Sequence, residues 1–235
     1  MCQSMFCAIP CPFRVWDEEA RPKMLLFLPV VGLEIGLIWW GIAQLATTLN
    51  LPELVRGLAI ALWPFLATGY LHLDGFMDVT DAVKSCRSLE RRREILKDSH
   101  VGAFAVINVA MLMLAQFAFA ASAEGDWRVL IFIPVVSRCG SALAVTLLPP
   151  MSTSQYAVQK INRSHAVVLA LMLTAAVAGG FLLCGKYGVA LAGGVAGYVL
   201  ALRKGYRSLE GMNGDISGYA LTVSELCSLL VLALI

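Results

Sequence analysis

The 235-residue sequence has few charged residues: 14% are Asp, Glu, Lys or Arg, whereas about 25% is usual for a soluble domain. Hydrophobic residues make up 59% of the chain, and the mean hydropathy is +0.76. This composition excludes a soluble globular enzyme. The formal net charge is only +2, and no basic stripe is interleaved with aromatic residues, so no nucleic-acid partner is expected.

The sequence also lacks the patterns that are typical of disulfide-bonded proteins, of zinc sites and of secretory signals. Its seven cysteines lie far apart without a Cys-x-x-Cys pair, and we expect them to be small buried hydrophobic residues. The segment 1–23 has no basic start followed by a long apolar run, so we do not interpret it as a secretory signal. No repeat or Pro-, Gly- or Ser-rich linker divides the chain, which predicts one integral-membrane catalytic domain over 1–235.

What the sequence does contain is a series of apolar runs of membrane-spanning length. The runs are continuous rather than alternating, which favours helices over the strands of a membrane barrel. We predict an all-α, polytopic membrane protein with about seven transmembrane helices, in a range of six to eight. The runs lie near residues 25–49, 57–72, 102–123, 129–149, 166–185, 187–202 and 219–235.

Lysine and arginine are concentrated in alternate connections between these runs. Fourteen of the 18 lie in the N-terminal segment and in the segments 73–101, 150–165 and 203–218. The other connections hold only Arg56, Arg128 and Lys186, and one base lies inside a run. Positive residues stay preferentially on the cytoplasmic side. We therefore predict a cytoplasmic membrane protein whose N-terminus, long loops and active site face the cytoplasm.

Three aspartates follow the second run. Asp74, Asp78 and Asp81 are spaced i, i+4 and i+7, which places them within about 60° on one helix face. Carboxylates this close repel one another unless a cation neutralises them, and Mg²⁺ commonly takes one or two carboxylates together with substrate phosphates. We therefore predict Mg²⁺ as the cofactor. The simpler alternative is a solvated helix end that pairs with Lys84 and the arginines 91–93.

Further polar residues lie next to the aspartates. The arginines 91–93 are followed by Lys97, Asp98 and Ser99, and cations beside an acid cluster suit a bound diphosphate and its metal. Anchoring on the cytoplasmic side explains the run 91–93 as well. His72 lies roughly opposite the aspartate face, where it is either a phosphate donor or a packed polar residue.

A second group of candidate residues precedes the last run. The segment 211–218 carries three glycines around Asp215, one of them Gly214, and such loops let a backbone approach a ligand or form an anion-binding nest. Asp215 is accordingly a candidate metal or nucleotide ligand. A common glycine-rich junction between a loop and a membrane helix is the alternative interpretation.

Three charged residues, Glu34, Arg138 and Glu225, lie within the apolar runs themselves. Glu225 is expected to face the interior of the helix bundle, because a carboxylate is costly in the membrane. Arg138 is costly for the same reason unless it is paired or solvated. It is either a phosphate clamp or the structural partner of Glu34 or Glu225.

These motifs resemble, in order and spacing, the cobalamin synthase family. The resemblance rests on His72-Leu-Asp-Gly-Phe-Met-Asp-Val-Thr-Asp81, Glu94-Ile-Leu-Lys-Asp-Ser-His-Val-Gly102 and Gly214-Asp-Ile-Ser-Gly218 with Glu225. It extends along nearly the whole chain and includes Ile9-Pro-Cys-Pro12, Pro29-Val-Val-Gly32 and Ser137-Arg138. The chain departs from the family pattern at Cys7-Ala8, His100, Met212-Asn213 and Thr222.

The resemblance implies a multi-pass transferase that joins adenosylcobinamide-GDP to α-ribazole, or to its 5′-phosphate, and releases GMP. This is a late step in assembling the nucleotide loop of cobalamin, and Mg²⁺ is the implied cofactor. The predicted catalytic residues are Asp74, Asp78 and Asp81, which also hold the metal, and His72. The general base is left open among the three aspartates, Asp98 and His72. The predicted substrate-binding residues are Lys97, Asp98, Ser99, Arg93, Arg138, Gly214, Asp215 and Glu225.

Two other functions compete with this interpretation. CDP-alcohol phosphatidyltransferases also gather aspartates at a membrane helix end, but their spacing differs, because here Gly75 directly follows Asp74. A transporter would use the intramembrane Glu34, Arg138 and Glu225 and would have two related halves, which the sequence lacks. The lipid bilayer is the expected environment, and a homo-oligomer is left open.

Overall fold

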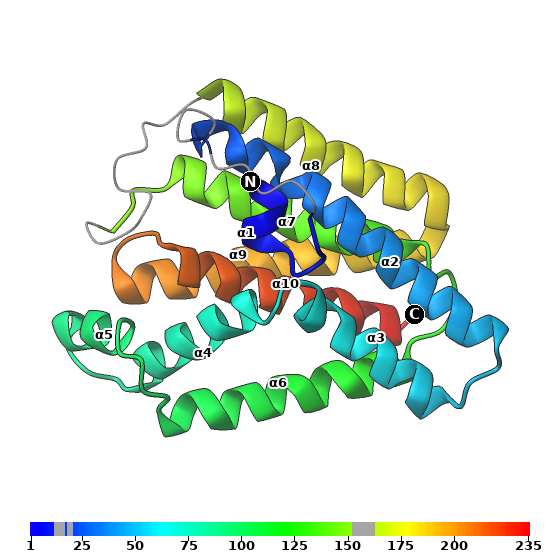
Figure 1. Cartoon of the computed structure of the whole chain (residues 1–235), viewed down its shortest axis with the longest axis horizontal. Coiled ribbons are helices and arrows are strands. Elements are labelled where there is room, and N and C mark those ends of the chain that lie inside the picture. Colours follow the sequence, from blue (N-terminus) through cyan, green and yellow to red (C-terminus); the bar gives the residue numbers. More distant parts are fainter. Residues whose placement is uncertain (12–16, 18–20, 152–162) are drawn as a thin grey trace.

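The computed structural model describes residues 1–11, 17, 21–151 and 163–235; for residues 21 and 22 it describes the backbone only. The regular elements of this part are helices, with no strand, and they pack as a bundle (Figure 1). The all-α prediction is thereby confirmed. The elements are α1 (Cys2–Phe6), the 3₁₀-helix η1 (Arg21–Phe27), α2 (Leu28–Thr48), α3 (Glu53–Ala67), α4 (Leu71–Lys84), α5 (Leu89–Ile95), α6 (Ala103–Ser122), α7 (Val129–Leu147), α8 (Arg163–Cys184), the 3₁₀-helix η2 (Gly185–Gly188), α9 (Val189–Leu209) and α10 (Gly214–Ala233).

Several segments are long and apolar enough to cross a membrane. Five such segments occur in the described chain, and the bent pair of α3 and α4 makes a sixth if it is counted as one span. The upper count of six lies within the predicted range of six to eight. The longest segment, Arg163–Leu209, has 47 residues and contains both α8 and α9. These helices turn back at η2 and run in opposite directions in Figure 1, in agreement with the separate runs predicted at 166–185 and 187–202.

Large apolar side chains cover the outside of the bundle. Leu182 on α8 is 85% exposed, and Leu200 on α9 and Leu114 on α6 are each 69% exposed. Surfaces of this kind are unfavourable in water and match the hydrocarbon of a bilayer. The protein is therefore a polytopic helical membrane protein.

The chain bends by 87° between α3 and α4. Gly69 (φ +57°) and Tyr70 (φ +66°) both adopt the left-handed conformation, which a helix cannot continue through. The carbonyl of Ala67 at the end of α3 instead accepts a 2.8 Å hydrogen bond from the amide of Ala8, so the N-terminal segment covers the bend. The three aspartates follow the run 57–72, as expected from the sequence, and the bend places them on a helix of their own, α4.

Helix α10 lies at the centre of the bundle and packs against α4, α6, α7 and α9. Small residues allow its close contact with α9: a Cβ atom added at Gly197 would lie 2.6 Å from the sulfur of Cys227. Membrane helices that have glycine at their contact can approach closely, and the close packing is stabilised by van der Waals attraction. This packing fixes the helix that carries Asp215 and Glu225.

One end of the bundle, which we call the basic end, is formed by α5, the last turns of α4 and α9, and the first turn of α10 (Figure 1). Arg93 of α5 ties these elements together, because its guanidinium donates to the carbonyl oxygens of Leu209 (3.0 Å) and Glu210 (2.8 Å). Most of the described bases in the predicted cytoplasmic segments lie here. Arg14 and Lys160, which belong to the same predicted group, lie outside the described residues, as does Pro12 of the N-terminal motif.

The opposite end of the bundle carries the three bases that the sequence assigned to the other side. The guanidinium of Arg56 lies 5.6 Å from the ring centre of Trp127, and Arg128 follows in the same loop. The ammonium of Lys186 donates to the carbonyl of Ile235 at 3.2 Å. The predicted separation of charge between two ends is therefore present in the fold.

Candidate functional site

Four aspartates come together where α4 crosses α10, near the basic end. Asp74, Asp78 and Asp81 lie on α4, and Asp215 lies in the first turn of α10. Asp78 is half-buried and lies between Asp74 and Asp81 on α4, close enough to Asp215 for the two charges to repel each other. We call these four residues the acid cluster. The fold thus joins two sequence motifs that are separated by more than a hundred residues.

The crossing of α4 and α10 depends on Gly75. A Cβ atom at this position would lie 2.9 Å from the carbonyl oxygen of Asp215 and 3.0 Å from its Cα atom. Asn213 then orients the carboxylate: its Oδ1 accepts the amide of Ile216 at 2.9 Å, and its Nδ2 donates to Asp215 at 2.6 Å. Neither Gly75 nor Asn213 is among the site residues predicted from the sequence. An Asn directly before Gly-Asp is a helix N-cap signal that could have identified Asn213.

The loop before α6 reaches the acid cluster through Gly102. A Cβ atom at Gly102 would overlap the carboxylate of Asp81, so the absence of a side chain is what allows this contact. Lys97 and Ser99 lie a few residues earlier in the same loop and are exposed. The structure therefore brings the Lys-Asp-Ser motif to the edge of the cluster.

Asp98 is already engaged at the surface of this loop. The backbone amide and the ring of His100 contact its Oδ1 atom at 3.0 Å and 2.7 Å, and these hydrogen bonds hold the pKa of Asp98 below its usual range. Asp98 is thus a stably ionised group with its own partner.

The acid cluster has no counter-charge in the described part of the chain. None of its four carboxylates forms an ion pair there. Arg91 pairs with Glu94 at 2.6 Å, Arg93 donates to the end of α9, and Lys84 has no ion-pair partner among these residues. The aspartates therefore do not pair with Lys84 or with the arginines 91–93 in the described structure, as the simpler alternative required.

The donors of the acid cluster are all carboxylate oxygens, which suit a hard cation. Among the described residues, no three His, Cys, Asp or Glu side chains are arranged to enclose a metal ion by themselves. Mg²⁺ needs no such enclosure, since it commonly keeps several waters and binds one or two carboxylates plus substrate phosphates. The cluster fits an ion of that kind and does not fit a closed metal site made of protein ligands alone.

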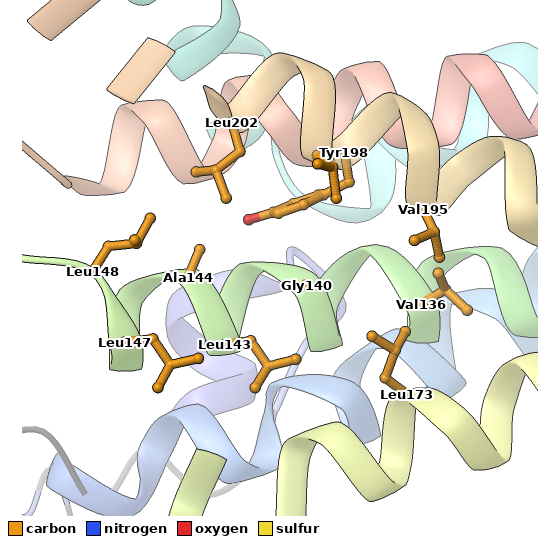
Figure 2. A pocket seen from close by; sticks show the side chains of 11 residues that line it. Val136, Gly140, Leu143, Ala144, Leu147, Leu148, Leu173, Val195, Tyr198 and Leu202 are labelled. Atoms are coloured by element: carbon orange, nitrogen blue, oxygen red, sulfur yellow. The ribbon is translucent and has the colours of Figure 1, made fainter. Parts of the chain in front are cut away.

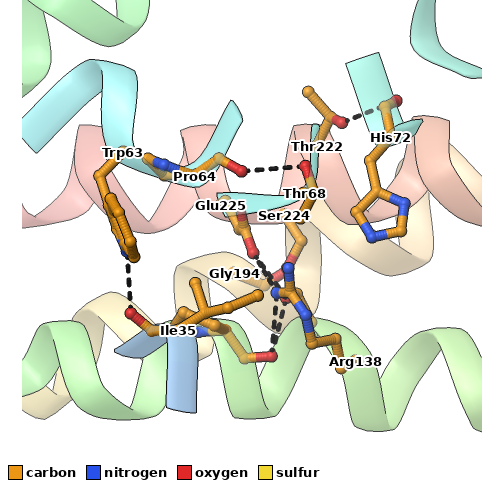
Figure 3. Close-up of polar contacts among 12 residues, drawn as sticks. Ile35, Trp63, Pro64, Thr68, His72, Arg138, Gly194, Thr222, Ser224 and Glu225 are labelled. Atoms are coloured by element: carbon orange, nitrogen blue, oxygen red, sulfur yellow. Dashed lines mark hydrogen bonds and ion pairs between the residues drawn. The ribbon is translucent and has the colours of Figure 1, made fainter. Parts of the chain in front are cut away.

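Arg138 and Glu225 form a buried ion pair in the middle of the bundle (Figure 3). Nη1 of Arg138 donates to Oε1 of Glu225 at 2.7 Å, and the hydroxyl of Ser137 donates to the same oxygen at 3.0 Å. Glu225 faces the bundle interior, as predicted. Of the two acidic partners predicted for Arg138, Glu225 is the one that it contacts. Glu34 instead accepts a 2.9 Å hydrogen bond from the side-chain amide of Gln3.

His72 lies on the side of α4 away from the acid cluster, as predicted, and is buried. Its carbonyl accepts the hydroxyl of Thr222 at 3.2 Å, and its backbone lies against Gly218 of α10. Figure 3 shows its imidazole on the side that faces Arg138. Within the described chain, Nε2 of His72 and the Nε and Nη2 atoms of Arg138 have no hydrogen-bond partner. His72 and Arg138 thus belong to the bundle interior.

An apolar cavity of about 250 Å³ lies between α7, α8 and α9 (Figure 2). Ten of its eleven lining residues are aliphatic or glycine, and the remaining one is Tyr198, whose ring lies along the cavity. None of the predicted site residues lines it. The cavity therefore does not belong to the acid cluster.

Comparison with known proteins matches the whole chain. A family model described as cobalamin-5-phosphate synthase matches residues 1–233. A protein of Clostridium perfringens (strain SM101) described as adenosylcobinamide-GDP ribazoletransferase is 36% identical, over 100% of this chain and 96% of its own length. Proteins with the same description from Clostridium botulinum (strain Alaska E43) and Brevibacillus brevis (strain 47) are each 34% identical, over 97% of this chain and 94% of their own length. No solved structure matches the chain.

Proposed function

The chain belongs to the cobalamin-5-phosphate synthase family, and we propose that it is an adenosylcobinamide-GDP ribazoletransferase. The reaction joins adenosylcobinamide-GDP to α-ribazole, or to its 5′-phosphate, and releases GMP. The observation that carries the proposal is the match along the whole chain to relatives described by this activity. The acid cluster supports it, because a donor that carries a diphosphate needs a site for the cation that accompanies it.

The proposed reaction exchanges one P–O bond for another. A hydroxyl oxygen of the ribazole attacks the phosphorus that carries the cobinamide, and the bond from that phosphorus to the phosphate of GMP breaks. The hydroxyl proton passes to the protein, and the electron pair of the broken bond leaves with GMP. In-line attack of this kind is accelerated mainly by positioning and charge stabilisation.

We propose that Asp74, Asp78 and Asp81 hold Mg²⁺, with Asp215 as a fourth carboxylate at the same crossing. Bound there, the ion would neutralise charge on the diphosphate and on the departing GMP. The support is chemical: four carboxylates lie near one helix crossing, and none of them forms an ion pair among the described residues. The Asn213 amide fixes the Asp215 carboxylate by a 2.6 Å hydrogen bond.

We propose that Asp78 accepts the proton of the attacking hydroxyl. This carboxylate is central in the acid cluster and half-buried. The other candidates are less suited by their positions, since Asp98 is occupied by His100 and His72 lies buried behind α4. A proton acceptor must lie within hydrogen-bond reach of the reacting hydroxyl, which favours a residue of the acid cluster, where we propose that the diphosphate binds with its cation.

We propose that Lys97 contributes positive charge to the phosphates from the loop that contacts Asp81 through Gly102. Arg93 serves instead to hold α5 on the end of α9, because its guanidinium is engaged by two carbonyls. Arg138, paired with Glu225, fixes α7 against α10. Charge-assisted hydrogen bonds to phosphate require a cation that is free to reach it, and Lys97 is exposed.

We also propose that the protein lies in the cytoplasmic membrane with the basic end toward the cytoplasm. Fourteen of the 18 bases lie in the segments assigned to that side, and positive residues are retained there. This orientation gives the acid cluster access to cytoplasmic substrates.

The proposed activity is tested with the purified full-length protein in lipid nanodiscs. Adenosylcobinamide-GDP, α-ribazole and Mg²⁺ should together yield GMP and one equivalent of cobalamin, both measured by chromatography. Omission of either substrate is the control. If no GMP forms, while a CDP-alcohol and its acceptor yield CMP, the proposal is wrong and the CDP-alcohol phosphatidyltransferase alternative is favoured.

A further inference from the structure

A polar pocket, with a volume of about 120 Å³, lies against the side of α4 that carries Phe76, Val79 and Val83. It is enclosed by α4, α6, α9 and α10 near the basic end. Its lining combines two lysines with a short apolar wall. The lining residues are Phe76, Val79, Thr80, Val83, Lys84, Asn108, Lys204 and Tyr219. At about 100° per residue, the apolar α4 members of this set point away from Asp74, Asp78 and Asp81, whereas Lys84 lies about 60° around the helix from Asp81.

The charged groups that line the pocket all carry the same sign. Lys84 comes from α4 and Lys204 from α9, and no carboxylate is among the lining residues. Among the described residues, neither lysine forms an ion pair or a hydrogen bond. Two ammonium groups at one small pocket repel each other, and an anion between them relieves that repulsion.

Hydrogen-bond donors other than the lysines also line the pocket. Thr80 and Tyr219 bring hydroxyl groups, and Asn108 brings an amide whose nitrogen already donates to the Phe104 carbonyl at 2.8 Å. The ring of Tyr219 is held by stacking on Phe76, with 5.5 Å between ring centres. Ammonium and hydroxyl donors converging from separate helices are the groups that bind phosphate oxygens.

Membrane orientation explains the presence of the two lysines but not this arrangement. Bases that only anchor a helix end extend into water or headgroups, and Arg203 and Arg207 on the same helix as Lys204 are exposed and do not line this pocket. Lys84 and Lys204 are exposed as well, but they come from different helices and share one pocket with hydroxyl groups and an apolar wall. Basic pockets between membrane helices are known to receive phosphate-bearing headgroups.

We propose that this pocket, which we call the lysine pocket, binds a phosphate group through Lys84 and Lys204. The phosphate belongs either to the headgroup of an anionic lipid or to a soluble phosphate. The apolar wall made by Phe76, Val79 and Val83 suits the carbon atoms attached to such a phosphate. The proposal does not depend on the transferase activity, because it uses none of the residues assigned to the reaction.

The test compares full-length protein with the double variant Lys84→Gln/Lys204→Gln. Arg203→Gln/Arg207→Gln is the matched control, since it removes two positive charges from the same end without touching the pocket. In one arm, native mass spectrometry counts phosphatidylglycerol retained by the detergent-purified protein. In the other, ³¹P NMR line widths follow a titration with inorganic phosphate. Thermal unfolding of each variant is measured in parallel.

The proposal expects the wild type and the control to bind a phosphate in at least one arm. The double variant should bind it about tenfold more weakly for each lysine removed. The arm in which binding is lost identifies the source of the phosphate. If the double variant unfolds, Lys204→Gln alone should weaken binding and Lys204→Arg should restore it. Equal binding by the double variant and the control, or no binding by the wild type in either arm, overturns the proposal.

Discussion

Nη1 of Arg138 and Oε1 of Glu225 lie 2.7 Å apart in the middle of the helix bundle, where both side chains are almost fully buried. The pair connects α7 with α10, the helix that also carries Asp215. A buried charge that loses its partner is left without solvation, so each member of the pair requires the other. The link therefore fixes α10 beneath the acid cluster.

The first prediction follows from this ion pair. Glu225→Ala should lower the free energy of unfolding by about 3–5 kcal/mol, because it leaves the Arg138 guanidinium buried and unpaired. The double variant Arg138→Met/Glu225→Leu should recover most of that loss, since no charge remains to be buried. Thermal unfolding of the detergent-purified proteins measures both. Equal stability of Glu225→Ala and wild type would show that the pair does not stabilise the fold.

The second prediction concerns the central carboxylate of the acid cluster. Asp78→Asn should lower kcat about a hundredfold or more, through loss of a metal ligand and proton acceptor. In Mg²⁺-free buffer it should unfold at the same or a higher temperature than wild type, because one of four repelling charges is gone. Glu124→Gln, at the opposite end of the bundle, is the control and should change neither quantity. Wild-type turnover by Asp78→Asn would contradict the proposed site.

A third prediction uses the contact between Gly102 and Asp81. Gly102→Ala adds a methyl group that overlaps the Asp81 carboxylate, so we expect a lower apparent affinity for Mg²⁺, seen as a severalfold rise in the Mg²⁺ concentration for half-maximal rate. Gly41→Ala is the matched control, because a Cβ atom at Gly41 meets no atom within 4 Å. If the two variants respond alike to Mg²⁺, Asp81 does not contribute to metal binding.

A fourth prediction tests the orientation in the membrane. Of the seven cysteines, Cys86 is exposed and the others are buried or half-buried. It follows α4 at the basic end, so a membrane-impermeant maleimide should label it in inverted vesicles and not in intact cells. Lys186→Cys in a Cys86→Ser background should give the reverse result. Labelling of Cys86 from outside intact cells would show that the basic end faces away from the cytoplasm.

Much of the helical architecture could be predicted because the membrane imposes it on each segment separately. Continuous apolar runs must form helices in hydrocarbon, and an intramembrane carboxylate such as Glu225 must turn toward the bundle. The spacing of Asp74, Asp78 and Asp81 likewise acts within one helix. Each of these statements needs only local sequence.

The remaining features depend on contacts between distant segments. Tyr70 takes a left-handed conformation that a non-glycine residue rarely adopts, so composition gave no sign that α3 ends there. The meeting of Gly75 with Asp215 depends on how α4 crosses α10. The choice between Glu34 and Glu225 as the partner of Arg138 also depends on which helices are neighbours. Hydropathy does not reveal this.

The hydrogen bond between the Ala8 amide and the Ala67 carbonyl also has a consequence for the order of synthesis. Residue 67 leaves the ribosome 59 residues after residue 8, which takes about 3–12 s at bacterial and eukaryotic elongation rates. During that interval the N-terminal segment has no partner at the bend. The segment around Ala8 therefore takes its place in the bundle only after α2 and α3 have been made.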